Sequence, residues 1–301
     1  MQALLRRENP LAFYIPCTAH SLNLVGVSAV DCCIDAVSFF GFVQALYTFF
    51  AATHRWTVLS DCLSRLPGKS LTLKFLSETR WSARADAVAA LCVGYEEIKS
   101  ALLDIGADDN QNGATRHEAN CLANSMDTLE TAFMSVLWNA ILTRYNETSI
   151  KLQSATCDLK LAIALLESLY AFTYDLRNRF DEFESNALTA SGNSDYLSVL
   201  ARPRKRTRHF DEMKGTDVVL QGRDKFRVET FIVIVNQLQT SLRGRIDAYK
   251  DVRKVFIVIA EFHVLDNDQL REHAQTLAVT YSTDLEPSMS CDEMVQFVHF
   301  A

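Results

Sequence analysis

Turn-forming residues are scarce in this chain, which has only 10 Gly and 5 Pro among 301 residues. A protein built from many short strands needs frequent turns, and Gly and Pro supply a large share of them. The scarcity therefore favours long helices. Helical spacing is clear over residues 154–184, where one side carries a series of apolar residues: Leu159, Ile163, Leu166, Tyr170, Leu176 and Phe180.

Two short segments have the pattern of strands. Residues 11–15 form an apolar run before Pro16, and residues 71–75 alternate apolar with polar side chains. The other elements are expected to be helical: residues 21–30, 36–52, 83–103, 119–145 and 154–184, apolar segments at 231–242 and 255–265, and a helix–turn–helix over 270–301. Strands near the start and a helical block in the middle predict an α/β core interrupted by a helical insertion.

The segment from Ala36 to Thr53 has no charged residue and approaches the lower length limit for a membrane span. It also contains Ser38, Gln44 and Thr48, so a buried core helix is favoured over a span, and no membrane partner is expected. The first residues of the sequence lack the long apolar region of a signal peptide.

Charge and cysteine content restrict the class of partner and the compartment. The net charge of -7 gives no overall attraction to nucleic acid, so DNA contact would need a local basic patch. One basic run could act as such a patch or as a nuclear-import signal, or be a solvated loop: Arg202, Arg204, Lys205, Arg206 and Arg208. The 8 Cys show no disulfide framework, which favours reduced thiols in a nuclear or cytoplasmic protein.

Cys17 and His20 have the separation of a zinc half-site. A second ligand pair is missing from the sequence, and Cys32 and Cys33, being adjacent, are expected to point in different directions. A structural role is favoured, with Cys17 packed and His20 hydrogen-bonded, and no metal site is predicted. No Gly-rich phosphate loop, nucleophile elbow or HExxH motif occurs, and no local signature marks a cysteine nucleophile.

Glu293 has two interpretations. It could be one of the carboxylates of a metal-dependent phosphoryl-transfer enzyme, which needs further carboxylates to hold divalent ions. Alternatively, Ser290 to Glu293 fit a capping box at the start of the last helix, and the pattern favours this second interpretation.

Several stretches together resemble one family. The stretches are ENPLAFYIPCTAHSLNLV with FFGFVQALYTFFAATHRWTVL, LKFLSETRWSARADAV, RPRKRTRHFDE, DKFRVETF, and LREHAQTLAVTYSTDLEPSMSCDEMVQFVHF, in order from about residue 8 to 299. They are similar to the transposase-derived proteins of the hAT superfamily, in particular the zinc-finger MYM-type protein 1-like branch. The resemblance implies an RNase H-like core with an all-α insertion.

The resemblance also implies roles for particular residues. Cys17, His20 and Asn23 fall in the family's Cys-x-x-His motif beside the active site. Arg80 and Trp81 fall in its Arg-Trp motif, where the insertion begins. Glu293 is the nearest match to the third of three acidic residues with which active members cut and join DNA.

Departures from the family pattern determine the expected function. The first two acidic residues would precede Met1, and the zinc finger and the C-terminal dimerisation region lie outside the sequence. One carboxylate cannot assemble a two-metal site. The resemblance therefore implies a catalytically inactive, nuclear protein that binds nucleic acid or protein. No cofactor is expected, and Mg²⁺ would enter only if a longer protein restored the acids.

The sequence predicts a chain of three segments. A mostly α fold is predicted, with a small β component: a partial RNase H-like core at 1–82, a helical insertion at 83–255 with a basic loop near 202–209, and a return to the core at 256–301. Homo-oligomerisation would use the region beyond the sequence. The alternatives are a helical scaffold without DNA affinity, a truncated form of an active transposase, and a zinc-binding module.

Overall fold

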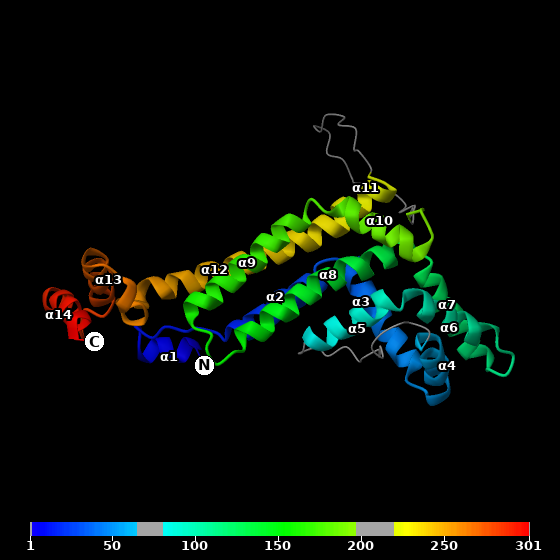
Figure 1. The fold of residues 1–301 in the computed structure, drawn as a ribbon, viewed down its shortest axis with the longest axis horizontal. Coiled ribbons are helices and arrows are strands. Elements are labelled where there is room, and N and C mark those ends of the chain that lie inside the picture. Colours follow the sequence, from blue (N-terminus) through cyan, green and yellow to red (C-terminus); the bar gives the residue numbers. More distant parts are fainter. Residues whose placement is uncertain (1, 65–80, 197–219, 301) are drawn as a thin grey trace, which may run out of the picture.

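The computed structural model describes residues 2–64, 81–196 and 220–300, and all regular structure in these ranges is helical (Figure 1). The prediction of a mostly helical protein is therefore confirmed. The strand predicted at 11–15 is wrong, because this segment is irregular and has no neighbouring strand in the described ranges. The strand predicted at 71–75 lies outside the described residues.

The helices follow one another with short connections. In chain order they are α1 (Gln2–Glu8), α2 (Thr18–Val30), α3 (Ile34–Phe50), α4 (Thr53–Leu63), α5 (Trp81–Val93), α6 (Tyr95–Ala107), α7 (Gly113–Met126), α8 (Leu129–Leu152), α9 (Leu159–Leu176), α10 (Phe180–Ser191), α11 (Gly222–Phe226), the π-helix η1 (Arg227–Phe231), α12 (Ile232–Ala260), the 3₁₀-helix η2 (Phe262–Val264), α13 (Asn267–Thr280) and α14 (Pro287–Phe300).

The molecule is elongated, and α2, α8, α9 and α12 lie along its long axis (Figure 1). Helix α12 packs against both α2 and α9, and α8 packs against α2, α5, α9 and α10. At one end, α4, α6 and α7 form a cluster, and at the other end α13 and α14 form a hairpin beyond α12. With 29 residues, α12 spans roughly 44 Å at the usual helical rise.

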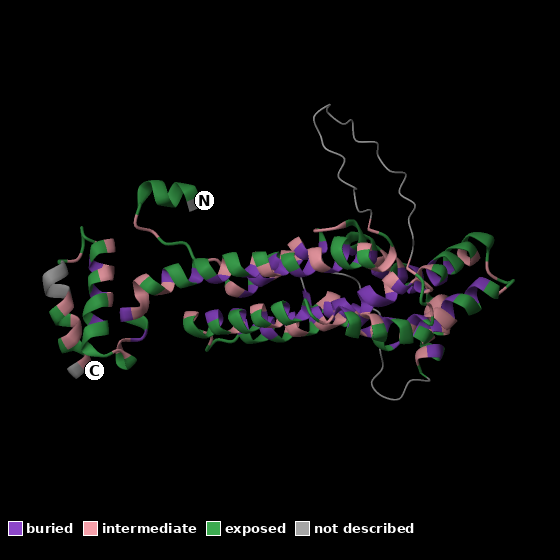
Figure 2. Cartoon of the chain, turned by 90° about the horizontal axis from the view of Figure 1, so that it is seen from above, coloured by how far each residue is buried: buried purple, intermediate pink, exposed green. Residues whose placement is uncertain are grey.

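Buried residues form one large core and one small one. The large core runs from Ala19 in α2 to Tyr249 in α12, and in Figure 2 its residues line the inner faces of the long helices. It joins the segment predicted as a partial core, 1–82, to the predicted insertion, 83–255. The small core is centred on Val258, Leu270 and Ala274. The three-segment division itself remains a prediction.

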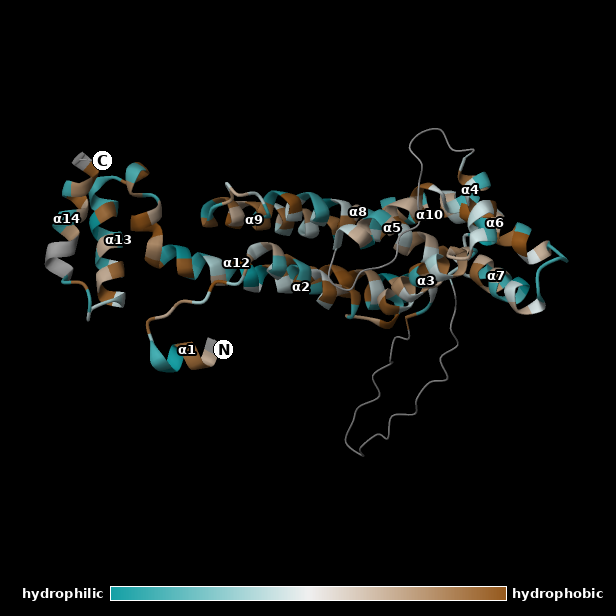
Figure 3. Ribbon diagram, turned by 90° about the horizontal axis from the view of Figure 1, so that it is seen from below, coloured by the Kyte–Doolittle hydropathy of each residue, from teal (hydrophilic) through white to brown (hydrophobic). Residues whose placement is uncertain are grey.

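Helix α3 contributes many hydrophobic residues to the large core (Figure 3). Its residues Phe39, Phe40, Phe49 and Phe50 are all buried, as the prediction of a core helix requires. No single helix in the described ranges is long and apolar enough to cross a membrane. The bent pair of α2 and α3, with 104° between its axes, passes the same test by length and composition alone.

Three predicted helices are each divided into two. The chain breaks between α5 and α6 at Gly94, between α7 and α8, and between α9 and α10. A polar cap accounts for the new start of α8, where Thr128 accepts from the backbone N–H of Thr131, whereas Arg179 at the start of α10 makes no side-chain capping hydrogen bond. Asp158, which accepts from the backbone N–H of Leu161, caps the start of α9. Conversely, the apolar segments at 231–242 and 255–265 belong mainly to the single helix α12.

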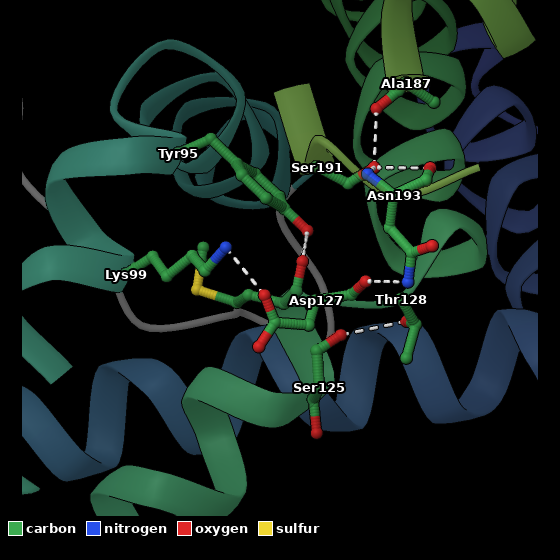
Figure 4. A network of polar contacts seen from close by, with 9 residues as sticks. Tyr95, Lys99, Ser125, Asp127, Thr128, Ala187, Ser191 and Asn193 are labelled. Atoms are coloured by element: carbon green, nitrogen blue, oxygen red, sulfur yellow. Dashed lines mark hydrogen bonds and ion pairs between the residues drawn. The ribbon is translucent and has the colours of Figure 1, made fainter. Parts of the chain in front are cut away.

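The turn between α7 and α8 is fixed by side chains from other helices (Figure 4). Tyr95 of α6 donates from its hydroxyl to the carbonyl oxygen of Met126 at 2.8 Å, and Lys99 pairs with Asp127 at 2.6 Å. Asn193, just after α10, donates from Nδ2 to the carbonyl oxygen of Asp127 at 3.0 Å. These contacts satisfy carbonyl groups at the end of α7 and hold α6 and α10 to the same turn.

Candidate functional site

The two motif stretches singled out in the sequence meet in the structure. Trp81, the first residue of α5, is 5% exposed, and its Nε1 donates to the carbonyl oxygen of Asn23 at 3.0 Å. Its ring lies against Gly26, where a Cβ would come within 2.2 Å of the Trp81 ring. The absence of a side chain at Gly26 therefore allows α5 to pack directly onto α2.

Further side chains surround the Trp81 ring. The ring of Tyr145, from α8, has its centroid 6.5 Å from that of Trp81. The Arg84 guanidinium lies 5.3 Å from the Trp81 ring and 5.2 Å from the Phe40 ring, within cation–π range of both. This cluster, comprising Trp81, Arg84, Phe40 and Tyr145, connects α5, α3 and α8 beside the motif helix α2.

Cys17 and His20 do not belong to that cluster. Cys17 is the N-cap residue of α2 without a side-chain capping hydrogen bond, and both side chains are exposed. The prediction that Cys17 is packed is therefore wrong. The helical period explains the error, because Leu22 and Val25 occupy the inner face of α2 and leave positions 17 and 20 outside. In the described ranges, no group of three or more His, Cys, Asp and Glu residues could hold a metal ion.

Tyr249 of α12 anchors the start of α2 from the inside. Its hydroxyl donates to Ser21 Oγ at 2.8 Å and lies 3.1 Å from the carbonyl oxygen of Pro16. Tyr249 is 2% exposed and Ser21 is 1% exposed. Burial raises the pKa of Tyr249, and the hydrogen bond with Ser21 opposes that rise.

A polar groove lies between α2 and α12, with a volume of about 380 Å³. It is defined by Leu24, Val25, Ser28, Thr240, Ser241, Gly244 and Arg245, and we call it the α2–α12 groove. Among the described residues, Arg245 is the one charged residue that lines this groove, and it is partly buried. The groove thus presents a guanidinium among hydroxyl groups and apolar side chains.

Hydrogen bonds organise the hydroxyl groups of this groove. Ser28 donates to the carbonyl oxygen of Val25 at 2.9 Å, so its oxygen accepts from Ser241, 3.1 Å away. Gln237 Nε2 donates to Ser28 Oγ at 3.2 Å and to Ser241 Oγ at 3.3 Å. The hydroxyl pair is therefore held in place in the same groove as the Arg245 guanidinium, which carries hydrogen-bond donors only.

Glu293 lies on the exposed side of α14. Helix α14 packs on α13 at the end of the molecule, whereas Trp81 begins α5 in its middle part (Figures 1 and 3). The capping-box prediction is wrong, because α14 begins at Pro287, a residue suited to the first helical position, and Ser290 lies inside the helix. The structure does not bring Glu293 to the motif residues.

The other predicted site residues fall outside the described part of the chain. They are Arg80 and the basic run Arg202, Arg204, Lys205, Arg206 and Arg208. Sequence reasoning missed Arg245 and Tyr249, which lie against α2 although more than 200 residues separate them from it in the chain. Tyr249 and Pro16, for example, are 233 residues apart. Only the tertiary packing of α12 on α2 could have revealed them.

Comparison of the chain with protein-family models, with curated proteins and with solved structures finds no match. The resemblance to hAT-derived proteins therefore depends on the sequence motifs.

Proposed function

We propose that this chain is a helical module of hAT-transposase origin, which acts by binding the phosphate backbone of nucleic acid and not by catalysis. The proposal includes the RNase H-like origin of residues 1–82 and the insertion at 83–255. The contact between Asn23 and Trp81 supports it, because two stretches that resemble the same family are 58 residues apart in sequence and lie against one another.

The α2–α12 groove is the observation that carries the binding function. A guanidinium with nearby hydroxyl groups is a common protein arrangement for a phosphate group. The other lining residues of the groove in the described part of the chain are neutral, so Arg245 supplies the formal charge of its lining. Since the whole chain has a net charge of -7, phosphate binding requires such a local site.

The position of Glu293 supports binding over catalysis. The resemblance would make Glu293 a metal ligand near the Cys-x-x-His motif, yet it lies on α14, which packs in the small core with α13. A two-metal reaction needs its carboxylates close together around the reacting phosphate. Mg²⁺-dependent cleavage of DNA by the purified chain would contradict this part of the proposal.

A fluorescence anisotropy titration with labelled duplex DNA at low salt tests the binding function. The informative variant is Arg245→Ala, and the matched control is Arg243→Ala, which removes the same charge two residues away. Arg243 is directed instead to Asp247, with Nε 3.2 Å from Oδ2. We expect Arg245→Ala to weaken binding about tenfold, as for a lost charge-assisted hydrogen bond, and Arg243→Ala to weaken it less than twofold.

Two results would overturn the groove as the binding site. One is no DNA affinity in the unsubstituted chain, and the other is an equal loss in the Arg245→Ala and Arg243→Ala variants. A third variant with the basic run of 202–208 changed to serines measures the separate contribution of that run. Its predicted role in nuclear import is tested by the location of a fluorescent fusion in cells.

A helical scaffold that binds a protein partner is the second candidate. It is favoured by the run Phe13, Tyr14 and Ile15, whose residues are 42%, 54% and 46% exposed. Three adjacent exposed apolar side chains are typical of a contact surface. A stable protein partner that is lost in a Tyr14→Ser variant, together with absent DNA affinity, would favour this candidate over the first.

A further inference from the structure

His117 and Cys121 form a pair of metal-ligating side chains on the outer face of α7. They stand four positions apart in the sequence, so both lie on the same side of the helix. Helical side chains also lean towards the N-terminus, which brings the sulfur of Cys121 back towards His117. Cys121 Sγ lies 3.6 Å from His117 Nε2, and both side chains are exposed. The two donor atoms therefore face each other where solvent reaches them.

The fold holds α7 firmly behind this pair. The start of α7 is capped by Asn112, whose side chain accepts from the backbone N–H of Thr115 at 2.8 Å. At its end, Tyr95 donates to the carbonyl oxygen of Met126 at 2.8 Å. The inner face of α7 contributes these residues to the large core: Ala119, Leu122, Ala123 and Met126. The pair can thus bind an ion by adjusting two side chains, without movement of the backbone.

Ion pairs compensate the charges on either side of His117. The guanidinium of Arg116 lies 2.9 Å from Asp109, measured from Nη1 to Oδ1. The carboxylate of Glu118 lies 3.9 Å from the Arg55 guanidinium, measured from Oε2 to Nη1. The positive charge of Arg116, which would repel a cation, is therefore balanced by a carboxylate beside it.

The distance between the two donor atoms matches a tetrahedral ion. In tetrahedral sites zinc lies about 2.3 Å from a thiolate sulfur and about 2.0 Å from an imidazole nitrogen, which places the two donors roughly 3.5 Å apart. With the same bond lengths, a linear site would need about 4.3 Å and a right-angled pair about 3.0 Å. The observed 3.6 Å fits the tetrahedral angle, and thiolate and imidazole are ligands that zinc prefers.

We propose that His117 and Cys121 chelate Zn²⁺ on the surface of α7. The unprotonated Nε2 of His117 gives its lone pair to the ion, and the ring keeps its proton on Nδ1. Cys121 binds as the thiolate, so the Zn–S bond forms while the proton of the thiol passes to solvent. In the described ranges no group of three or more His, Cys, Asp and Glu residues could hold a metal. The chelate therefore has two protein donors, and water fills the two positions that face solvent.

This chelate is separate from the site of the proposed binding function. Helix α7 belongs to the cluster with α4 and α6 at one end of the molecule, whereas the α2–α12 groove lies between two of the long helices (Figure 1). Zinc binding and nucleic-acid binding can therefore fail independently of one another.

Cys17 and His20 provide a comparator within the same chain. They are the same two residue types, and both are exposed. Cys17 is the N-cap residue of α2 with the non-helical backbone angles φ -54° and ψ 128°, so it does not share a helical face with His20. If exposure and residue type were sufficient, both pairs would bind zinc equally well.

The first experiment measures how far zinc protects each thiol of the full chain. The reduced chain is alkylated with iodoacetamide near neutral pH at increasing Zn²⁺ concentration, and peptide mass spectrometry gives the rate at each cysteine. We expect Zn²⁺ to slow alkylation of Cys121 about tenfold at a concentration that slows Cys17 by less than about twofold, because a zinc-bound thiolate is no longer free to react. Equal protection of the two thiols, or none at Cys121, would overturn the proposal.

The second experiment removes the donors one at a time. His117→Ala should raise the Zn²⁺ concentration that protects Cys121 at least about tenfold, as for the loss of one of two chelating donors. The matched control, His20→Ala, should leave it unchanged. Both replaced side chains are exposed, and far-UV circular dichroism checks that the variants keep their helices. An unchanged zinc requirement in His117→Ala would overturn the chelate.

Co²⁺ in place of Zn²⁺ gives a spectroscopic readout of the same site. A cobalt–thiolate bond produces a sulfur-to-metal charge-transfer absorption, which the unsubstituted chain should show when Co²⁺ is added. The absorption should be lost in Cys121→Ser and kept in Cys17→Ser, and added Zn²⁺ should displace the cobalt. Absorption that persists in Cys121→Ser, or that disappears in Cys17→Ser, would assign the metal to other thiols and contradict the proposal.

Discussion

The indole Nε1 of Trp81 lies 3.0 Å from the carbonyl oxygen of Asn23, and the indole ring covers Gly26 one turn further along α2. The hydrogen bond gives the buried N–H its acceptor, and the glycine provides the space for the ring. The position of α5 therefore depends on both residues, because the Trp81 ring fits against α2 only where Gly26 has no side chain.

Gly26→Ala should destabilise the protein, although alanine is the better helix former. A Cβ at position 26 would meet three ring atoms of Trp81 at 2.2 to 2.5 Å. Displacing the ring breaks its hydrogen bond with Asn23, and overpacking of this kind costs about 2 kcal/mol. We expect that loss in the free energy of unfolding, measured by urea denaturation followed by far-UV circular dichroism.

Gly41→Ala is the matched control for this prediction. Gly41 lies inside α3, and a Cβ there would meet no atom of the described residues within 4 Å. The substitution should raise the free energy of unfolding by up to about 1 kcal/mol through helix propensity. If both variants gained stability, the close contact between Trp81 and Gly26 would be refuted.

The sequence revealed part of this site and could not reveal the rest. Local patterns indicated that Asn23 and Trp81 belong to related motifs, and the apolar period identified the inner face of α2. Arg245 and Tyr249 have no local signature, because their proximity to α2 arises only when α12 packs on it. The break at Gly94 was missed for a similar reason, since apolar spacing continues across it.

Two buried tyrosines should respond in opposite ways to the loss of their hydroxyl groups. In the part of the chain that the structure describes, Tyr145 Oη has no hydrogen-bond partner, and burial raises its pKa. Tyr249 donates to Ser21 at 2.8 Å. A buried polar group without a partner retains its desolvation cost, whereas a bonded one contributes net stability.

Tyr145→Phe is therefore expected to raise the free energy of unfolding by about 1 kcal/mol, and Tyr249→Phe to lower it by about 1 kcal/mol. Both variants remove a single oxygen from a ring that is almost fully buried, so each serves as the other's control. Thermal and urea unfolding of the two variants provide the measurement. A loss of the same size in both would show that Tyr145 has a partner of its own.

Glu261 should make stability depend on pH through its ion pairs with two helices. Its Oε2 lies 2.8 Å from Lys160 Nζ of α9, and its Oε1 lies 2.6 Å from Arg253 Nη2 of α12. Burial acts to raise the pKa of Glu261, but the hydrogen bonds from Lys160 and Arg253 outweigh it and lower the pKa below 4.5.

The sign of the effect follows from this lowered pKa. The unfolded state binds the proton more tightly, so the stabilisation is present in full above about pH 4.5 and is lost as the pH falls through the lower folded value. Glu261→Gln should therefore reduce stability near neutral pH, and the difference from the unsubstituted chain should disappear at acidic pH. Urea unfolding over this pH range tests it.

Glu182→Gln provides the comparison for Glu261. Glu182 pairs with Arg179 within the same part of the chain at 2.7 Å, and its side chain is 51% exposed. Exposed pairs of this type contribute only a few tenths of a kcal/mol. If Glu182→Gln had an effect as large as that of Glu261→Gln, the link between α9 and α12 would not be the source of the pH dependence.

Phe13→Ala should loosen the α13–α14 hairpin selectively. Phe13 contacts the ring of Phe256 at 5.4 Å and that of Tyr281 at 6.4 Å between centroids, and the Tyr281 hydroxyl donates to the carbonyl oxygen of Leu11. The hairpin otherwise depends on the small core around Val258. Because a small core opens more readily than a large one, amide exchange of α13 should accelerate in the variant while that of α8 stays unchanged. Hydrogen exchange measured by mass spectrometry tests this prediction. An equal increase in the amide exchange rates of α13 and α8 would contradict it, because that result means global destabilisation and not release of the hairpin.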